Sequence, residues 1–476
     1  MSHPERLEIP QAVVDILVRL EEAGHETWCV GGAIRDRLLG DDQLDVDLAT
    51  AAPPGAVQRL FRRTVPVGID HGTVGVLDPE GVLHEVTTFR RDVRTDGRRA
   101  EVEFGVSLDD DLARRDFTIN AIAWHPVRGE WRDPFGGRAD LAAGIIRAVG
   151  DPAARFREDR LRILRALRFA ARFDFAIDPA TWEAARAQAP DTVHLSAERV
   201  REEWWKGVRS ARDPRSLLRL WRDAGVAEAW FADGAPRWDE PPSVPEDVAR
   251  DPLLLLAAWR TPVAPILQRL KTSGAEIQRV RAIDRGPAAL ASSERFAVRR
   301  WMARVGEAAE DLARLARVGV ASPPAWLETR RGIVTRGEAT ARRQLALGGD
   351  DLVREGIVSP GPALGAMLDR LLEAVLETPD LNRRETLLEL ARRNAQSARR
   401  NSSPRWIRWP RECARARSMS SWDKSTCSPP ASRWVTRSVA VTWAAACSGD
   451  RRAPATPRSP GSSPPPPSAT SFRSAR

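Results

Sequence analysis

Apolar residues in the first 150 positions alternate between helical and strand-like spacing. Period-3.6 spacing predicts an amphipathic helix, and short apolar runs bounded by turn residues predict strands. The elements predicted in this way are a helix over 9–23 ending near Gly24, a buried strand at 27–32, a helix over 31–40 that begins at the glycines, a strand at 44–50, and a hairpin of 73–78 and 81–89 joined by a turn at 78–81. The first 150 residues are therefore expected to be mixed α and β.

From about Asp151 the pattern changes to long helical repeats rich in Arg, Ala and Leu. Examples are FREDRLRILRALRFAARF at 156–173 and SAERVREEWWKGV at 196–208. Strand signals almost disappear, so an all-helical region is expected to follow the mixed head, and the fold class is α+β. A proline-rich stretch at 234–247 is a candidate boundary between two helical parts.

The stretch from Ala395 onward has a third character. It lacks leucine, contains five tryptophans and many serines, arginines and prolines, and shows no periodicity. Such a composition cannot form a hydrophobic core, so the segment is expected to be a low-complexity, disordered tail. An out-of-frame reading of a GC-rich gene would give the same composition. The predicted division is a head at 1–150, a helical neck at 151–235, a helical body and tail at 236–394, and the basic segment at 395–476.

Charge and cysteine content narrow the possible environments. The net charge of +9 arises in the last 76 residues, where 13 basic residues face 3 acidic ones, leaving 61 basic and 62 acidic residues in 1–400. Bulk charge is therefore no argument for nucleic-acid binding by the folded part. Cys29 is the only cysteine before residue 400, which is typical of a reducing cytoplasm. We expect a cytoplasmic protein with no membrane partner, since no apolar run of about 18 residues is present and the start of the chain lacks a signal-peptide pattern.

The first candidate chemistry lies at Gly31-Gly32 and at Asp45 and Asp47. Glycines between a strand and a helix let backbone N–H groups approach a phosphate closely. Asp45 and Asp47 are two apart on one strand, so both carboxylates project from the same face, where they suit Mg²⁺ bound together with substrate phosphates. The combination indicates phosphoryl or nucleotidyl transfer. Each feature alone is also compatible with a tight turn or with a solvated strand edge.

Further motifs extend the pattern along most of the chain. In order they are VGGAIRDRLLG with DVD (30–47), HGTVGV (71–76), EVTTFR (85–90), DGRR (96–99), ARRDFTINAIAW (113–124), DPFGG (133–137), FREDRLRILRALRF (156–169), SAERVREE (196–203) and the stretch 361–391. Together they resemble class II tRNA nucleotidyltransferases, the CCA-adding enzymes and their bacterial poly(A) polymerase relatives in the DNA polymerase β-like superfamily. The resemblance covers about residues 9–394.

The resemblance implies roles for individual residues of the head. Asp45 and Asp47 would hold the Mg²⁺ ions that activate the RNA 3′-hydroxyl and bind the triphosphate. Gly32 and Arg35 match positions that contact the phosphates of the incoming nucleotide. Arg115 and Asp116 match the ribose and nucleotide contact region, which would favour ribonucleotides. Arginine suits such sites because its guanidinium binds phosphate oxygens bidentately.

The helical pattern at 156–169 carries a second candidate set, Asp159, Arg162, Arg165 and Arg168, which recur every three residues and so are expected to share one helix face. An aspartate that accepts from a base amino group and an arginine that donates to ring acceptors could read a base edge. The resemblance implies that CTP and ATP are selected through Glu158, Asp159 and Arg162. A surface helix with ordinary Glu–Arg and Asp–Arg pairs would show the same spacing.

The predicted function is template-independent addition of CCA to tRNA 3′ ends from CTP and ATP with Mg²⁺. The DGRR loop departs from the family, with Arg94 in place of an aromatic residue and Arg99-Ala100 in place of His-Pro, so poly(A), CC-only or A-only addition stays open. The HGT sequence at 71–73 argues against the poly(A) branch. A small-molecule nucleotidyltransferase would share the glycines and the aspartates, and a non-catalytic RNA-binding protein would share the helical part.

The helical part is expected to bind tRNA, not DNA, through its shape and phosphates. Candidate basic helices lie near 199–212 and 299–317, although solvated surface charge is the default interpretation of both. The oligomeric state is left open.

Overall fold

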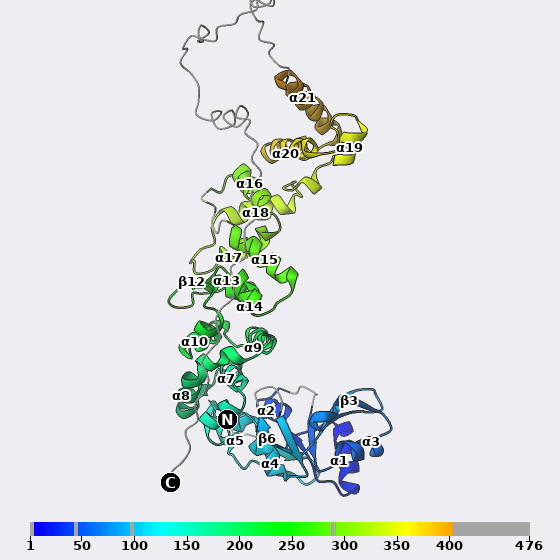
Figure 1. Ribbon diagram of the computed structural model, residues 1–476, viewed down its shortest axis with the longest axis vertical. Coiled ribbons are helices and arrows are strands. Elements are labelled where there is room, and N and C mark those ends of the chain that lie inside the picture. Colours follow the sequence, from blue (N-terminus) through cyan, green and yellow to red (C-terminus); the bar gives the residue numbers. More distant parts are fainter. Residues whose placement is uncertain (1–3, 42–45, 96–99, 287–289, 291, 403–476) are drawn as a thin grey trace, which may run out of the picture. The chain divides into compact units, whose positions relative to one another are not determined.

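The first four predicted elements are present in the computed structural model, which describes residues 4–41, 46–95, 100–286, 290 and 292–402 (Figure 1). They are α1 (Gln11–Glu22), β1 (Thr27–Val30), α2 (Gly32–Leu38) and β2 (Asp47–Thr50). Helix α1 buries Val13, Ile16, Leu17 and Leu20, the positions that its period predicts. It ends before Gly24, whose φ of +83° is a left-handed conformation that glycine adopts without strain.

The head is built on a seven-stranded sheet with strand order β3-β4-β5-β2-β1-β8-β9. Its remaining strands are β3 (Thr64–Gly68), β4 (Thr73–Leu77), β5 (Leu83–Thr88), β8 (Ala123–His125) and β9 (Glu130–Arg132). Strands β4 and β5 form the predicted hairpin, and their turn is closed by the Val82 N–H donating to Asp78 Oδ1 at 2.7 Å. Strand β2 pairs with β5 in parallel and with β1 antiparallel. The mixed-sheet head is therefore confirmed.

Short elements complete the head around this sheet. They are α3 (Pro54–Leu60), α4 (Leu108–Ala113), the 3₁₀ turn η2 (Thr118–Asn120), α5 (Gly137–Ala143) and the separate ribbon of β6 (Arg90–Thr95) and β7 (Ala100–Phe104). The DGRR sequence at 96–99, on which the predicted specificity loop depends, lies outside the described residues. Helix α4 begins with a capping box, because Ser107 Oγ accepts from the Asp110 N–H and the Asp110 carboxylate accepts from the Ser107 N–H.

The neck is helical, as predicted, but the helix expected over 156–173 is two helices. The neck contains α6 (Pro152–Glu158), α7 (Leu161–Phe173), α8 (Pro179–Gln188), α9 (Ala197–Ser210), α10 (Pro214–Asp223) and α11 (Val226–Trp230). Asp159 lies between α6 and α7 in an extended conformation, with φ −147° and ψ 104°. Its carboxylate accepts from the Leu161 N–H and its carbonyl from the Arg162 N–H, both at 3.0 Å. A short acidic side chain that caps the next helix competes in this way with continuation of the preceding one.

An aromatic cluster crosses the predicted boundary at 235/236. Trp204, Trp221, Phe231 and Trp259 pack with ring centroids 5.0–6.1 Å apart. In addition, β12 (Ala235–Pro236) pairs with β13 (Arg260–Thr261). The proline-rich segment therefore does not divide the hydrophobic core. Among the described residues a separate core begins at Ala339 and includes Leu352, Leu371 and Leu387.

The rest of the described chain is helical. Its helices are α12 (Glu246–Ala249), α13 (Pro252–Trp259), α14 (Ala264–Arg269), α15 (Gly274–Arg285), α16 (Arg295–Val305), α17 (Ala309–Leu315), α18 (Trp326–Thr335), α19 (Gly349–Arg354), α20 (Pro362–Glu377) and α21 (Arg384–Ser402). Helix α21 continues through 395–402, so the expectation that the disordered tail begins at 395 is wrong for these residues. Ala395 is partly buried against the second core, which extends the helix beyond the last leucine. Residues 403–476 lie outside the described part of the chain.

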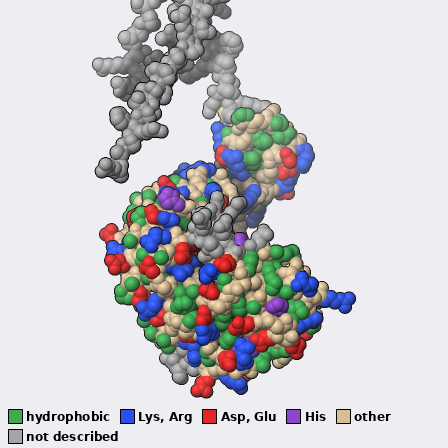
Figure 2. Space-filling view, turned by 60° about the horizontal axis from the view of Figure 1, so that its bottom comes forward, with side chains coloured by type: hydrophobic (Ala, Val, Ile, Leu, Met, Phe, Trp, Pro, Cys, Tyr) green, Lys and Arg blue, Asp and Glu red, His purple; other side chains and the backbone are tan. Residues whose placement is uncertain are grey.

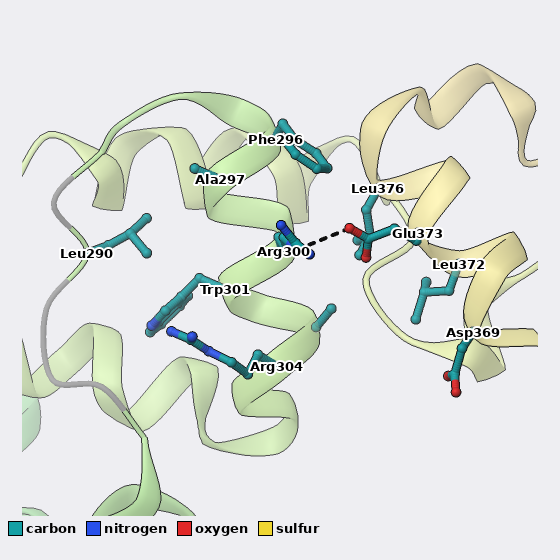
Figure 3. A pocket seen from close by; sticks show the side chains of 11 residues that line it. Leu290, Phe296, Ala297, Arg300, Trp301, Arg304, Asp369, Leu372, Glu373 and Leu376 are labelled. Carbon is teal, nitrogen blue, oxygen red and sulfur yellow. Dashed lines mark ion pairs between the residues drawn. The ribbon is translucent and has the colours of Figure 1, made fainter. Parts of the chain in front are cut away.

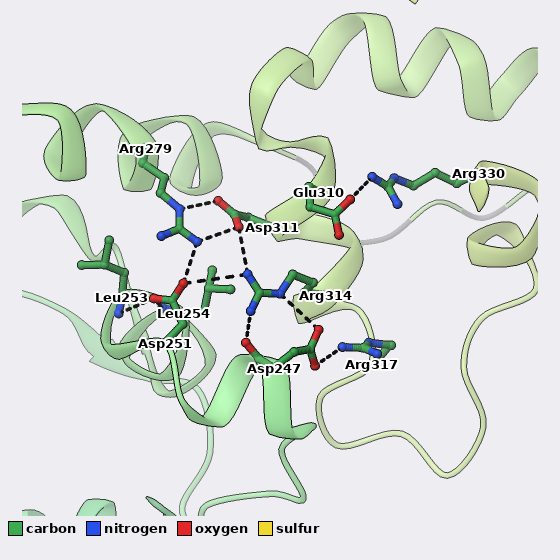
Figure 4. Close-up of polar contacts among 10 residues, drawn as sticks. All are labelled: Asp247, Asp251, Leu253, Leu254, Arg279, Glu310, Asp311, Arg314, Arg317 and Arg330. Atoms are coloured by element: carbon green, nitrogen blue, oxygen red, sulfur yellow. Dashed lines mark hydrogen bonds and ion pairs between the residues drawn. The ribbon is translucent and has the colours of Figure 1, made fainter. Parts of the chain in front are cut away.

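Ion pairs connect several helices of the body (Figure 4). Arg279 on α15 donates to Asp311 on α17 and to Asp251 before α13, each at 2.7 Å. Arg314 donates to Asp247 on α12 at 3.1 Å, and Arg317 pairs with the same carboxylate. Arginines of the predicted RNA-binding stretch 299–317 are thus partly engaged within the protein. None of the helices formed by the described residues is long and apolar enough to cross a membrane.

Candidate active site

The two glycines lie where β1 meets α2, beside the start of β2. Gly31 has φ +81°, and the register of β1 with β2 places Val30 opposite Asp47. A Cβ added to Gly31 would lie 2.9 Å from Arg115 Nη1 and 3.7 Å from Asp47 Oδ2. Glycine is therefore needed here for its backbone conformation and for the close approach of these side chains. Gly31, Asp47 and Arg115 form one small polar centre at the end of the sheet.

Asp47 is the described member of the predicted metal-binding pair, and Asp45 lies outside the described residues. Within the described ranges no three His, Cys, Asp or Glu side chains are grouped as metal ligands. The half-buried Asp47 carboxylate fits the oxygen-donor chemistry of a hard divalent cation. That Asp45, two residues earlier, presents its carboxylate on the same face stays a prediction from the sequence spacing.

Arg35 on α2 is almost entirely buried, with 4% of its surface exposed. Its Nε donates to Asp36 Oδ1 at 2.8 Å, its Nη1 donates to Asn120 Oδ1, and its guanidinium lies 4.9 Å from the ring centroids of Phe169 and Phe173. Burial lowers the pKa of this guanidinium, and the Asp36 carboxylate opposes that effect. A Cβ on Gly32 would lie 3.3 Å from Arg35 Nη2, so the glycine leaves space for this side chain. In this conformation Arg35 is held by protein groups, and its contact with phosphate stays a prediction.

Arg115 and Asp116 are adjacent in sequence but form hydrogen bonds with different groups. Arg115 Nη2 donates to Asp111 Oδ2 and its Nη1 donates to the Asn120 carbonyl, both at 3.2 Å. Asp111 is buried and also binds Arg114 at 2.9 Å. Burial alone would raise the pKa of Asp111, but the two arginines outweigh it and the pKa is lowered. Asp111 therefore stays ionised and holds Arg115 beside the glycines.

Asp116 connects the head to helix α7. Its Oδ2 accepts from Arg165 Nε at 2.7 Å, and its Oδ1 accepts from the Phe117 N–H at 2.9 Å and from Asn120 Nδ2 at 2.8 Å. Burial would raise the pKa of this carboxyl, but Arg165 and these hydrogen bonds lower it. Burial would lower the pKa of Arg165, but Asp116 raises it further. The pair is therefore ionised on both sides, with all three donors aimed at one carboxylate.

The predicted base-reading residues do not share one helix face. Asp159 lies before α7 and accepts from Arg199 Nη2 at 2.7 Å. Arg162 donates to Glu158 Oε2 at 2.6 Å and to the Arg114 carbonyl at 3.0 Å. The shared face expected from the three-residue spacing is thus wrong for Asp159, because the helix begins only at Leu161.

Arg168, one turn after Arg165 on α7, is mostly buried and donates to Glu203 Oε2 on α9 at 2.6 Å. Burial lowers the pKa of its guanidinium, and Glu203 opposes this. The structure therefore brings Arg165 to the head through Asp116 and directs Arg168 toward α9. A role for either residue in nucleotide binding stays a prediction.

Several residues of the site were not predicted. Asn120 bonds to Arg35 and Asp116, Asp111 holds Arg115, and Glu203 neutralises Arg168. Asn120 and Asp111 each had a local signal, since Asn120 stands four residues after Asp116 and Asp111 stands four residues before Arg115. Glu203 lies in the motif SAERVREE, but its pairing with Arg168, 35 residues away, depends on the tertiary fold.

The described surface shows basic and acidic side chains interspersed on the face displayed in Figure 2. A cavity of about 630 Å³ in the body is lined by residues of α16 and α20, including Arg300, Trp301, Arg304 and Glu373 (Figure 3). Arg300 pairs with Glu373 at 3.1 Å across it, and both side chains are at least half exposed. The cavity lies on helices of the body and not beside Gly31 and Asp47.

Comparisons with known proteins agree with the motifs. Residues 27–147 match the family "Poly A polymerase head domain", and residues 174–234 match "Probable RNA and SrmB- binding site of polymerase A". The CCA-adding enzyme of Leuconostoc mesenteroides is 36% identical over 405 residues, which cover 81% of this chain and 97% of that protein. The CCA-adding enzyme of Lactiplantibacillus plantarum is 36% identical over 403 residues, with the same coverage.

Solved structures give the same result. The Bacillus stearothermophilus CCA-adding enzyme in complex with CTP is 31% identical and aligns with a TM-score of 0.67 over 82% of this chain and 98% of its own. The Thermotoga maritima CCA-adding enzyme complexed with tRNA_CCA, at 21% identity and a TM-score of 0.58, shares the fold. Nucleotidyltransferases of this kind generally use a divalent metal. By sequence and by fold, this chain is an RNA nucleotidyltransferase that belongs to the family of CCA-adding enzymes.

Proposed function

We propose that this protein adds CCA to the 3′ ends of tRNA from CTP and ATP, with Mg²⁺, and releases diphosphate. The observation that carries the proposal is the convergence of Asp47 and Arg115 on Gly31, which places a carboxylate suited to a divalent cation beside a guanidinium suited to a nucleotide. The Bacillus stearothermophilus relative, whose structure is described as a complex with CTP, supports the choice of nucleotide.

In this proposal different residues bind the metal, the phosphates and the ribose. Asp45 and Asp47 would hold Mg²⁺, which would neutralise charge on the triphosphate and lower the pKa of the attacking 3′-hydroxyl. Gly32 and Arg35 would orient the phosphates, and Arg115 and Asp116 would orient the ribose and the nucleotide. Arg165 is bound to Asp116 and thereby connects this centre to helix α7.

Nucleotide selection would then depend on the start of α7 together with Arg165 and Arg168. Asp159 and Arg162 are paired with Arg199 and Glu158, so a base that binds them has to exchange these partners for its own amino group and ring acceptors. Such an exchange favours bases whose donor and acceptor pattern replaces both lost contacts, since an unpaired buried charge is costly. This requirement selects C and A without a nucleic-acid template.

The helical body would bind tRNA through phosphate contacts. Arg300 and Arg304 on α16 are candidates because they line an open cavity and Arg300 is more than half exposed. A cytoplasmic location stays a prediction from cysteine usage.

Incubation of the purified protein with tRNA that lacks CCA, Mg²⁺ and each labelled nucleoside triphosphate tests the proposal. Addition of two C and then one A is expected. Long A tracts would indicate a poly(A) polymerase, and C-only or A-only products a relative with a divided function. Asp47→Asn is expected to abolish incorporation, whereas Asp15→Asn, which alters an exposed carboxylate on α1, serves as the matched control. Full activity of the Asp47 variant would contradict the metal assignment.

A further inference from the structure

The side chain of Asn120 lies at the centre of the head's buried polar network. Asn120 is 6% exposed and lies in η2. Its Oδ1 accepts from Arg35 Nη1 on α2, its Nδ2 donates to Asp116 Oδ1 at 2.8 Å, and its carbonyl accepts from Arg115 Nη1 at 3.2 Å. One residue thus contacts three side chains that are proposed to bind the nucleotide.

The chemistry of these contacts requires a carboxamide. Arg35 is a donor and needs an acceptor, while the ionised Asp116 is an acceptor and needs a donor. Aspartate in place of Asn120 would keep the acceptor but would place a second carboxylate against Asp116 at hydrogen-bond distance. Leucine, which has the same branched shape but bulkier methyl groups, would leave both partners without the contact. Because the network is buried, each lost partner carries a desolvation cost.

We propose that Asn120 is a positioning residue that fixes Arg35 and Asp116 relative to each other, and through them aligns the phosphate and ribose contacts of the bound nucleotide. It touches no reacting atom in this scheme. The inference rests on the proposed function, because Arg35 and Asp116 are assigned to the nucleotide there. The inference adds that the relative position of Arg35 and Asp116, and not only the presence of these two residues, sets the preference for a ribonucleotide.

The test compares the full-length wild type with Asn120→Leu and Asn120→Asp. The readouts are the KM and kcat for CTP with tRNA that lacks CCA, and the equilibrium affinities for CTP and dCTP without tRNA. We expect the CTP affinity of both variants to fall about tenfold or more and the ratio of CTP to dCTP affinity to fall with it. The loss of about one net hydrogen bond to the nucleotide corresponds to roughly a tenfold fall in affinity. The kcat at saturating CTP is expected to change less than KM.

Thr27→Val is the matched control for a merely structural effect. It removes a buried hydrogen bond of 2.8 Å with Thr50 in the same sheet and contacts none of the proposed nucleotide-binding residues. The unfolding temperature of each variant is measured so that losses of stability can be compared with losses of CTP affinity. An unchanged CTP to dCTP ratio in Asn120→Leu, or an equal fall in Thr27→Val, would overturn the inference. Failure of the wild type to extend tRNA while it still binds CTP would overturn the proposed function alone, and failure to bind CTP would overturn both.

Discussion

The Arg168–Glu203 pair offers a direct test of how α7 is fixed to α9. The two side chains are 10% and 5% exposed, and Arg168 Nε lies 2.6 Å from Glu203 Oε2. Arg168 also lies 4.2 Å from the ring centroid of Phe169. Glu203→Ala removes the carboxylate and leaves the guanidinium buried beside an aromatic ring. The structure therefore predicts that this variant is destabilised because a charge has lost its partner.

The size of the effect follows from burial. Removal of one partner of a buried ion pair costs about 3–5 kcal/mol. The remaining contact with Phe169 keeps part of the stabilisation, so we expect about 3 kcal/mol, which corresponds to a fall in unfolding temperature of roughly 6–12 °C for a cooperative unit of about 150–250 residues. The double variant Arg168→Met/Glu203→Leu replaces the pair by apolar groups and is expected to recover most of the loss, since neither charge then stays buried.

The assay is thermal unfolding of Arg168→Met, Glu203→Leu and the variant that carries both, analysed as a double-mutant cycle, with Glu203→Ala measured beside them. Glu328→Ala, which removes an exposed partner of Arg331, is the surface control and is expected to leave the unfolding temperature unchanged. Additive effects of the two single substitutions, or a loss in Glu203→Ala no larger than in the control, would refute the structural role. If Glu203→Gln instead left the unfolding temperature unchanged and altered CTP affinity, Arg168 would act on the nucleotide, as the sequence motif suggests.

Three further predictions concern the glycine turn, acid stability and the basic tail. Gly31→Ala is expected to lose most nucleotide incorporation, because the residue has φ +81° and its new Cβ, 2.9 Å from Arg115 Nη1, would displace that guanidinium. Gly24→Ala has φ +83° but open space around the Cβ, so it should lose only about 1–2 kcal/mol of stability. Equal activities of the two variants would contradict the close approach of Arg115 to Gly31. Folding lowers the pKa of Asp116 from its usual 3.8, so the ionised carboxylate stabilises the fold fully above that pH, and this stabilisation disappears as the pH falls through the lower pKa of the folded state. Between pH 6 and pH 3, the unfolding temperature of Asp116→Asn should therefore fall less steeply than that of the wild type. Truncation after Ser402 should leave tRNA extension unchanged, and a loss of tRNA affinity, measured against salt concentration, would show that the segment is an RNA-binding arm.

The secondary structure of the head could be predicted from the sequence because its signals are local. The period of α1, the glycine at its end and the turn at 78–81 each act within a few residues, and all three are present. The break between α6 and α7 could not be predicted from periodicity. The four charged residues at 157–160 are all compatible with a helix surface, and the deciding factor is that the Asp159 carboxylate accepts from the Leu161 N–H.

The candidate site was predicted in its residue types but not in its connections. The motifs contain Arg35, Arg115 and Asp116, yet the partner of Arg35 is 85 residues away and that of Asp116 is 49 residues away. Such pairings depend on how α2, η2 and α7 come together in three dimensions. Buried polar groups need partners wherever they lie, so the identity of each partner becomes visible only once the fold is known.

The same pairings bear on how a nucleotide can bind. In the structure the proposed nucleotide-binding groups already have partners within the protein: Arg35 is bound to Asn120 and Asp36, and Asp116 is bound to Arg165. A network in which every member is paired is rigid, so a ligand that matches it gains affinity with little loss of conformational entropy. A ligand that lacks one required group has to leave a buried donor or acceptor unpaired, which costs more than the missing contact would have contributed. In the proposed scheme, discrimination between ribose and deoxyribose would come from the alignment of Arg35 and Asp116 by Asn120, and discrimination between bases from the exchange of Arg199 and Glu158 for groups of the base.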